Sequence, residues 1–457
     1  MAQQKPHSSK TWLGREEPRL ARRIGLSMQR FLGIEAAGGI LLIFAAAIAL
    51  IWANSPWSGS YFDLWNTEIN LSIGELISLE HHGHALTLGE FINDVLMVLF
   101  FFVVGLEIKR ELVTGELNTT RAASLPAAAA IGGMVVPALI YFAFNQSGEA
   151  MEGWGIPMAT DIAFAVGVVS LLGTRVSTSL KIFLLTLAIV DDIGAILVIA
   201  LFYTSDLSAG WLVAAVLTVL AVVLLKKIKI WYMPVYVVLG IFLWYAIFES
   251  GVHATIAGVI MGLLAPARPL LVDEEEVELL KMQNIDEVRT QSLSRLAFQV
   301  KETVPVTERL QNLLHPLTGF IILPLFALAN AGVVLSTDAI GDAASSGITQ
   351  GIVVGLVVGK IVGITLFTLL AVKIGLCTLP PGTTTRHIAG IASIAGIGFT
   401  VSMFISGLAF DNAMLQDEAK IGILFASIVA AIIGTVILYK SSEIKEVSED
   451  DVMTETI

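Results

Sequence analysis

Cysteine is nearly absent from this 457-residue chain: Cys377 is the single one, so an internal disulfide framework is excluded. Charge is also scarce, because Asp, Glu, Lys and Arg make up 14% of the residues, against about 25% in an ordinary soluble domain. The formal net charge of −12 argues against a nucleic-acid-binding protein. Neither an HExxH zinc motif nor a Walker-type phosphate loop occurs, so zinc proteolysis and ATP-driven pumping lack their sequence signatures.

Apolar residues are abundant instead and account for 55% of the chain, which excludes a water-soluble globule. A membrane span needs about 20 predominantly apolar residues. Windows of about 19 residues predict an all-α polytopic membrane protein with twelve transmembrane helices. The apolar windows are residues 33–53, 87–108, 123–144, 151–173, 180–203, 209–225, 231–248, 251–266, 316–336, 350–372, 388–410 and 419–439.

The basic residues are concentrated in the tails and in alternate connections. Lys360, within a span, and Lys420, at the edge of the last span, are the exceptions. By the positive-inside rule both termini are therefore cytoplasmic. The first apolar run is too long for a cleaved signal peptide, so we expect a retained span. The predicted order is an N-terminal tail, spans 1–8, an acidic cytoplasmic loop, spans 9–12 and a C-terminal tail, at residues 1–32, 33–266, 267–315, 316–440 and 441–457.

Two connections carry patterns of their own. In the outer region 57–74, residues 68–73 (EINLSI) alternate as in a strand with one apolar face. Because an isolated strand is marginal, it requires a hairpin or a partner chain. The loop 267–315 starts with an acidic run and continues with apolar residues at helical spacing. A partly ordered helix and a solvated linker both remain open for it.

Ionisable residues inside spans are costly and mark functional sites by default. Asp191 and Asp192 lie about half-way along their span. Neighbouring residues on a helix point about 100° apart, so we expect one carboxylate to line a cavity while the other faces a partner. The alternative is a pair of protonated carboxyls that only packs helices.

Asp161 follows a segment that contains Pro157, which disfavours a continuous helix. Thr160 is a good N-cap for a new half-helix that starts at Asp161. The sequence thus predicts a broken span, with the positive end of the half-helix beside the Asp161 carboxylate. A purely structural role for Asp161, as the counterion of this helix dipole, is the alternative.

Lys360 lies deep within its span and needs an anionic partner or a lowered pKa. The next span contains Gly396 and Gly398, which favour a second break. Paired breaks in two halves of a chain indicate the binding site of a transporter. Glycines used only for close helix packing are the alternative interpretation.

The remaining polar groups have weaker patterns. Asp94, Glu107 and Glu111 form either an acidic funnel that gathers cations or a self-neutralising rim. His253 opens an apolar span and favours a hydrogen-bonded packing role. The histidines in 81–84 fit a solvated loop better than a metal site.

Buried carboxylates, a buried lysine and two helix breaks suit a small cation that competes with protons. Carboxylate oxygens suit hard cations such as Na⁺, and removal from water disfavours the charged form of a carboxyl group. The same oxygens can then hold a cation or protons. Exchange without a cofactor follows if the site opens alternately to each side.

The sequence resembles the NhaA-type bacterial sodium/proton antiporters from about residue 30 to 440. The resemblance rests on five motifs: VGLEIKREL at 104–112, ATDIAFA at 159–165, AIVDDIGA at 188–195, SGVHAT at 250–255 and GIGFT at 396–400. It implies a multi-pass protein of the bacterial inner membrane, not an enzyme, with two inverted repeats and crossed broken helices. It also implies an outer β-hairpin that joins two protomers into a homodimer.

The resemblance further assigns roles to individual residues. Asp192 is the main ligand of Na⁺ or Li⁺, with Asp191 as gate or salt-bridge partner. Asp161 and Thr160 belong to the cation site, and Lys360 is its charge partner. The positions tied to the pH response are Glu107, Glu111 and His253.

The chain departs from the family's best-known members before His315, where Gln311 and Asn312 replace an acidic residue and a histidine. This puts the pH response in doubt but leaves the transport residues intact. A cation channel or another proton-coupled cation transporter remains an alternative. An intramembrane aspartyl protease is disfavoured because its Gly-x-Gly-Asp context is missing.

Overall fold

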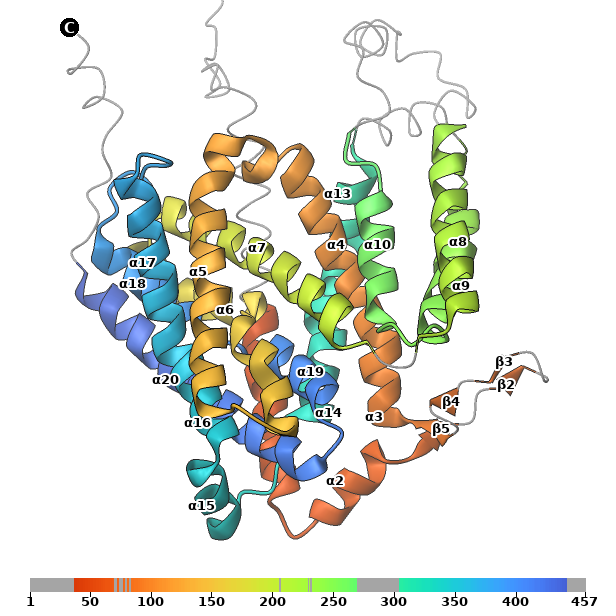
Figure 1. Cartoon of the computed structure of the whole chain (residues 1–457), viewed down its shortest axis with the longest axis horizontal. Coiled ribbons are helices and arrows are strands. Elements are labelled where there is room, and N and C mark those ends of the chain that lie inside the picture. The colour runs from red at the N-terminus through yellow and green to blue at the C-terminus, as the bar shows by residue number, and fades with distance from the viewer. Residues whose placement is uncertain are drawn as a thin grey trace, which may run out of the picture.

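The computed structural model of the chain describes residues 37–69, 72–73, 77–78, 80–81, 84–204, 207–228, 230, 232–268 and 304–441. The predicted N-terminal tail lies outside the described residues. The same holds for residues 442–457 of the C-terminal tail and 269–303 of the predicted loop. The described part is mostly helical (Figure 1).

Helices occupy all twelve predicted apolar windows. Among the described residues, seven helices are long and apolar enough to cross a membrane, or ten if each bent pair is one span. The protein is therefore a multi-pass membrane protein. The count of twelve stays a prediction, because it also needs the shorter apolar helices α9 (Met233–Phe248) and α10 (Thr255–Leu264). The other windows hold Ala37–Ala53, α3 to α4 (Leu88–Val113), α5 (Thr120–Phe144), η3 and α6 (Glu149–Met158, Ile162–Leu171), α7 (Thr178–Phe202), α8 (Ala209–Lys227), α13 to α14 (Val306–Asn330), α16 to α17 (Gly347–Lys373), α18 and α19 (Thr385–Ile394, Phe399–Ala409) and α20 (Ala413–Lys440).

Several long helices start at capping side chains, and long helices expose apolar residues. Ser177 accepts the Leu180 N–H at the start of α7, and Asn412 accepts the Met414 N–H at the start of α20. At 1.5 Å per residue, the 25 residues of α7 rise about 37 Å, more than the roughly 30 Å of a hydrocarbon core. Exposed leucines and valines on α8 fit a surface that faces lipid.

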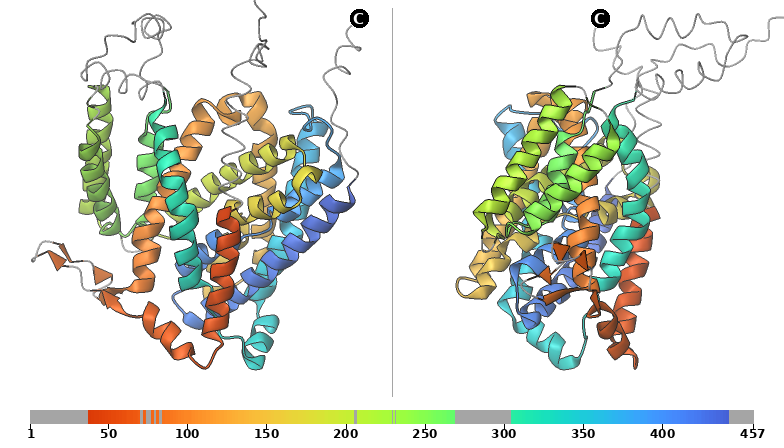
Figure 2. Two further views of the ribbon diagram at one scale, coloured as in Figure 1. Left: turned by 180° about the vertical axis from the view of Figure 1, so that it is seen from behind. Right: turned by 90° about the vertical axis from the view of Figure 1, so that its right-hand side faces the viewer.

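The helix connections lie at two opposite ends of the bundle. Figures 1 and 2 place the corner between α4 and α5, the end of α8 and the connection from α17 to α18 at one end. The short helices α2 (Ser58–Trp65) and α15 (Thr337–Ser345) lie at the other end. The end with the first set of connections carries the basic residues Lys226, Lys227 and Lys373. That this end is cytoplasmic stays a prediction.

The outer region 57–74 differs in part from its prediction as strand. Residues 58–65 form α2, because Tyr61 and Trp65 are four residues apart and bury the same helix face. The Tyr61 hydroxyl donates to the Leu328 carbonyl at 2.8 Å and so holds α2 against the end of α14 (Leu323–Asn330).

Strands begin only after α2. They are β1 (Glu68–Ile69), β2 (Ser72–Ile73), β3 (Ile77–Ser78), β4 (Glu80–His81) and β5 (His84–Thr87). β1 pairs with β5, β4 with β5 and β2 with β3, in each case antiparallel. The alternating segment therefore does form strands, but only of two residues each.

Candidate ion-binding site

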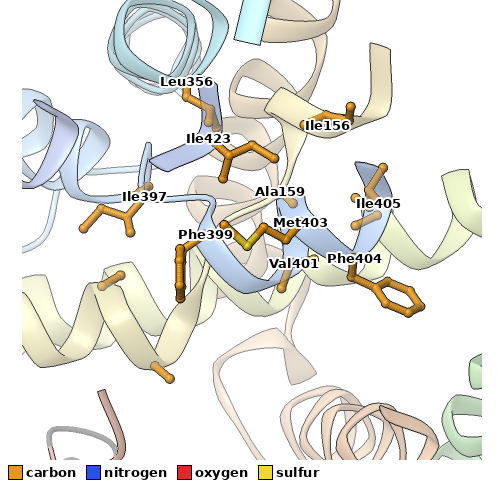
Figure 3. Packing of buried hydrophobic residues seen from close by; sticks show 14 of the residues in the cluster. Ile156, Ala159, Leu356, Ile397, Phe399, Val401, Met403, Phe404, Ile405 and Ile423 are labelled. Carbon is orange, nitrogen blue, oxygen red and sulfur yellow. The ribbon is translucent and has the colours of Figure 1, made fainter. Parts of the chain in front are cut away.

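Two helices are interrupted inside the bundle, and their breaks lie against each other. The 3-10 helix η3 meets α6 at a bend of 43°, and α18 meets α19 at a bend of 51°. Figure 3 shows Ala159 of the first break next to Phe399 and Met403 of the second, and side chains from both breaks belong to one apolar cluster. Both predicted breaks are present.

Hydrogen bonds join the two breaks directly. The Asp161 N–H donates to the Ile397 carbonyl at 2.7 Å, and the Ser402 hydroxyl donates to the Ile156 carbonyl at 2.8 Å. Gly396 lets the second break also pack closely against the segment that contains Leu356, because a Cβ there would lie 2.3 Å from the Leu356 carbonyl oxygen. Gly396 thus serves both the break and close packing, and the two interpretations of this glycine do not exclude each other.

Asp161, and not Thr160, is the N-cap of α6, so the prediction for the cap was wrong. Asp161 has extended backbone angles, which place its Oδ1 2.9 Å from the Phe164 N–H. Its Oδ2 accepts the N–H and the hydroxyl of Thr400, at 3.0 and 2.6 Å. One buried carboxylate therefore compensates the positive ends of two half-helices, α6 and α19.

Lys360 is fully buried at the start of α17 (Lys360–Lys373), directly after the π-helix η7 (Gly355–Gly359). Its Nζ donates to the Asp191 carboxylate, to the Met158 carbonyl and to the Thr160 hydroxyl oxygen. The three hydrogens of an ammonium group match these three acceptors. The anionic partner that the sequence demanded for Lys360 is Asp191.

Asp191 and Asp192 face different surroundings near the middle of α7. Asp191 is 2% exposed and also accepts the Thr160 hydroxyl at 2.6 Å. Asp192 is 6% exposed and lines a pocket. Asp192 is therefore the carboxylate at a cavity, and Asp191 is the one that faces a partner, as expected.

The pocket gathers several of the predicted residues. Its polar lining consists of Glu107, Thr160, Asp161, Asp192, His315, Thr318 and Thr400. Within the described ranges, no group of three or more His, Cys, Asp or Glu side chains is arranged to hold a metal ion. A cation in this pocket would therefore need hydroxyl or backbone oxygens in addition to carboxylates.

The acidic residues of α4 (Met97–Val113) divide into two sets. Glu107 is buried and lines the pocket, whereas Glu111 pairs with Arg110 at 3.2 Å and accepts the Glu116 N–H. Arg110 also donates to the buried Gln311 at 3.3 Å. The contacts of Glu111 thus match a neutralised rim more closely than an open acidic funnel.

Four other residues singled out by the sequence do not line the pocket. Asp94 is buried in the π-helix η1 (Ile92–Leu96), at the opposite end of its span from Glu107. The His253 ring packs edge-on against Phe404, with centroids 5.9 Å apart. Gly398 lies at the second break, and Asn312 is exposed on α13 (Val306–Leu317).

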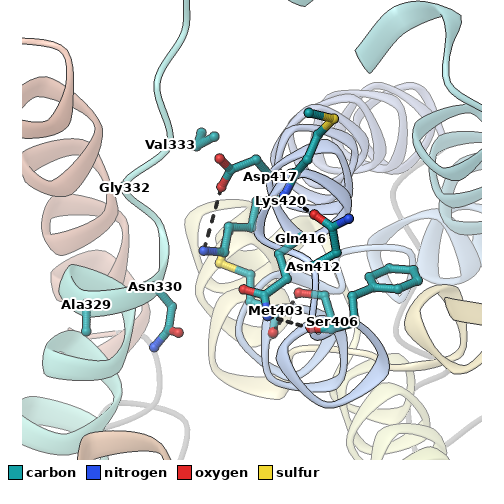
Figure 4. Close-up of polar contacts among 12 residues, drawn as sticks. Ala329, Asn330, Gly332, Val333, Met403, Ser406, Asn412, Gln416, Asp417 and Lys420 are labelled. Atoms are coloured by element: carbon teal, nitrogen blue, oxygen red, sulfur yellow. Dashed lines mark hydrogen bonds and ion pairs between the residues drawn. The ribbon is translucent and has the colours of Figure 1, made fainter. Parts of the chain in front are cut away.

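Lys420, which the basic-residue pattern singles out, lies on α20 one turn from Asp417. Their charged groups are 4.0 Å apart. Figure 4 shows this pair beside Asn330 and Met403, facing the segment with Gly332 and Val333.

Sequence reasoning missed three polar pocket residues, Thr400, His315 and Thr318. Thr400 follows the second predicted break, as Thr160 and Asp161 follow the first. A search for polar residues in the first turn after each predicted break would therefore have found Thr400. His315 had no such indication, because its position depends on how α13 packs against α4.

Comparisons with known proteins agree with this geometry. The family described as Na⁺/H⁺ antiporter 1 matches residues 29–438. The protein named Na(+)/H(+) antiporter NhaA 3 of Frankia alni is 47% identical over 91% of this chain and 89% of its own length. Similar relatives are Na(+)/H(+) antiporter NhaA of Rhodopirellula baltica (45%; 89% and 92%) and NhaA 2 of Syntrophotalea carbinolica (44%; 90% and 96%). From the match over almost its whole length, the chain belongs to the Na⁺/H⁺ antiporter 1 family.

Proposed function

We propose that the protein exchanges cytoplasmic Na⁺ for external protons across the bacterial inner membrane. The observation that carries this proposal is the unequal environment of two adjacent buried carboxylates. Asp192 lines a pocket, while Asp191 is held by Lys360 and Thr160. Family membership and the names of the relatives support the same function.

In this mechanism Asp192 binds the cation and protons in turn. A carboxylate that has lost its proton offers charged oxygens to a hard cation, and a protonated carboxyl does not. Asp191 acts as a gate, because its charge is taken up by Lys360 until the cation arrives. The two breaks, joined by hydrogen bonds, are the part of the fold that rearranges when access switches from one side to the other.

The finer points of the proposal are supported by resemblance and by the described geometry. We propose twelve spans in two inverted repeats, with crossed broken helices and both termini cytoplasmic. Transport needs no cofactor, accepts Li⁺ as well as Na⁺, moves net charge and depends on pH through Glu107, Glu111 and His253. Two protomers associate through the outer strands.

The test measures collapse of a proton gradient in everted membrane vesicles when Na⁺, Li⁺ or K⁺ is added. Vesicles with the protein should respond to Na⁺ and Li⁺. The Asp192→Asn variant should not, because it lacks the charged oxygen that binds both ions. Asp338→Asn, an exposed residue of α15, is the matched control and should behave as the unmodified protein.

Two outcomes contradict the proposal. Substantial exchange by Asp192→Asn would remove that residue from the site. Na⁺ flux that proceeds without any proton movement would indicate a channel.

A further inference from the structure

The Thr400 hydroxyl lies where a buried oxygen can meet a cation. Thr400 is the second residue of α19, is 1% exposed and lines the same pocket as Asp192. Its hydroxyl hydrogen is donated to Asp161 Oδ2 at 2.6 Å. A hydroxyl group has one hydrogen and two lone pairs, so the lone pairs of Thr400 Oγ1 point elsewhere.

Those lone pairs are not used by the rest of the described chain. None of the described residues donates a hydrogen bond to Thr400 Oγ1. Thr160, the hydroxyl that the sequence favoured, differs in this respect, because its oxygen already accepts from Lys360 at 3.0 Å. Asp161 likewise commits Oδ1 to Phe164 and Oδ2 to Thr400.

We propose that Thr400 Oγ1 is a neutral ligand of the transported cation and helps to determine cation specificity. This inference rests on the proposed function. Hard cations take several oxygen ligands, and a carboxylate such as Asp192 is one of them. The hydroxyl does not titrate near neutral pH, so it adds affinity for Na⁺ without adding affinity for protons. The bond to Asp161 fixes the position of the oxygen, which sets the size of cation that fits.

The test compares three purified variants with the unmodified protein. Thr400→Val keeps the shape of the side chain but removes the oxygen, and Thr400→Ser keeps the hydroxyl. Thr368→Val is the matched control, because Thr368 is fully buried on α17 and its hydroxyl has no partner among the described residues. Two quantities are measured for Na⁺ and Li⁺: the KM of exchange, and the rise in Tm that each cation produces.

For Thr400→Val the KM for Na⁺ should rise about tenfold or more, as expected when a partner of a charged group is lost. The rise in Tm produced by Na⁺ should shrink accordingly. The ratio of KM for Na⁺ to KM for Li⁺ should change, while the dependence of KM on pH should keep its slope. Thr400→Ser and Thr368→Val should both stay within about twofold of the unmodified protein.

The inference is overturned if Thr400→Val lowers Tm in the absence of Na⁺ but leaves both KM and the rise in Tm with Na⁺ unchanged. Thr400 would then only position Asp161. If Thr400→Val does not fold, Thr400→Cys replaces a hard oxygen ligand by a soft sulfur, and the same loss of Na⁺ affinity is expected. Failure of the unmodified protein to exchange Na⁺ for protons would instead contradict the proposed function itself.

Discussion

The buried ion pair between Lys360 and Asp191 allows a quantitative prediction. Lys360→Gln removes the charge that faces Asp191, which is 2% exposed and whose Oδ1 has no hydrogen-bond partner among the described residues. Removing one partner of a buried ion pair costs about 3–5 kcal/mol, because the other charge stays buried and unpaired. For a chain of this length, that range corresponds to a decrease in Tm of about 3–5 °C.

The double variant Lys360→Gln/Asp191→Asn provides the decisive comparison. Two neutral amides can hydrogen-bond to each other and leave no unpaired charge, so the double variant should be more stable than Lys360→Gln alone. The interaction energy of the double-mutant cycle should reach about 2 kcal/mol or more. The assay is thermal unfolding of purified protein in detergent without Na⁺. Lys373→Gln, at the exposed end of α17, is the control for loss of a lysine.

The reasoning is refuted if Lys360→Gln is as stable as the unmodified protein. It is also refuted if the losses of the two single variants simply add in the double variant. Either result would mean that the Asp191 carboxylate does not carry an unpaired charge when Lys360 is absent.

Two further variants test the surroundings of the site. Gln311→Glu places a negative charge against Arg110, so the dependence of gradient collapse on pH should shift. Asn312→His changes an exposed residue and should leave this dependence unchanged. Equal pH profiles for both variants would show that the contact between residue 311 and Arg110 does not influence the pH response. Gly396→Ala adds a Cβ that would lie 2.3 Å from the Leu356 carbonyl oxygen, so thermal unfolding should show a loss of about 1–3 kcal/mol. Gly407→Ala, in open space on α19, should be neutral or slightly stabilising. Equal stability of the two alanine variants would contradict the close packing of the second break against Leu356.

Much of the fold follows from local patterns. Apolar windows locate the helices, because about 20 apolar residues in a row have few alternatives to a membrane helix. Pro157 and the glycines at 396 and 398 mark both breaks. Neighbouring residues on a helix face different directions, which separates Asp191 from Asp192.

The parts that were missed depend on contacts between distant segments. Whether Thr160 or Asp161 caps α6 is decided by Thr400, Lys360 and Asp191, and all three lie on other helices. The π-helix before Lys360 has no signature in the local sequence. The predicted strand region began at residue 57 because of the alternating pattern at 68–73. Tyr61 and Trp65, which are four residues apart as on one face of a helix, belong to α2 instead.

The central claim is that one set of carboxylates binds either the cation or protons. The measurement that tests it most directly is the KM for Na⁺, from solid-supported-membrane currents recorded across pH at several Na⁺ concentrations. The account predicts that KM rises on the acidic side of the optimum by about tenfold per pH unit for each proton displaced. A KM that does not depend on pH in that range would mean that cation and protons occupy different sites, and would contradict the shared-carboxylate mechanism.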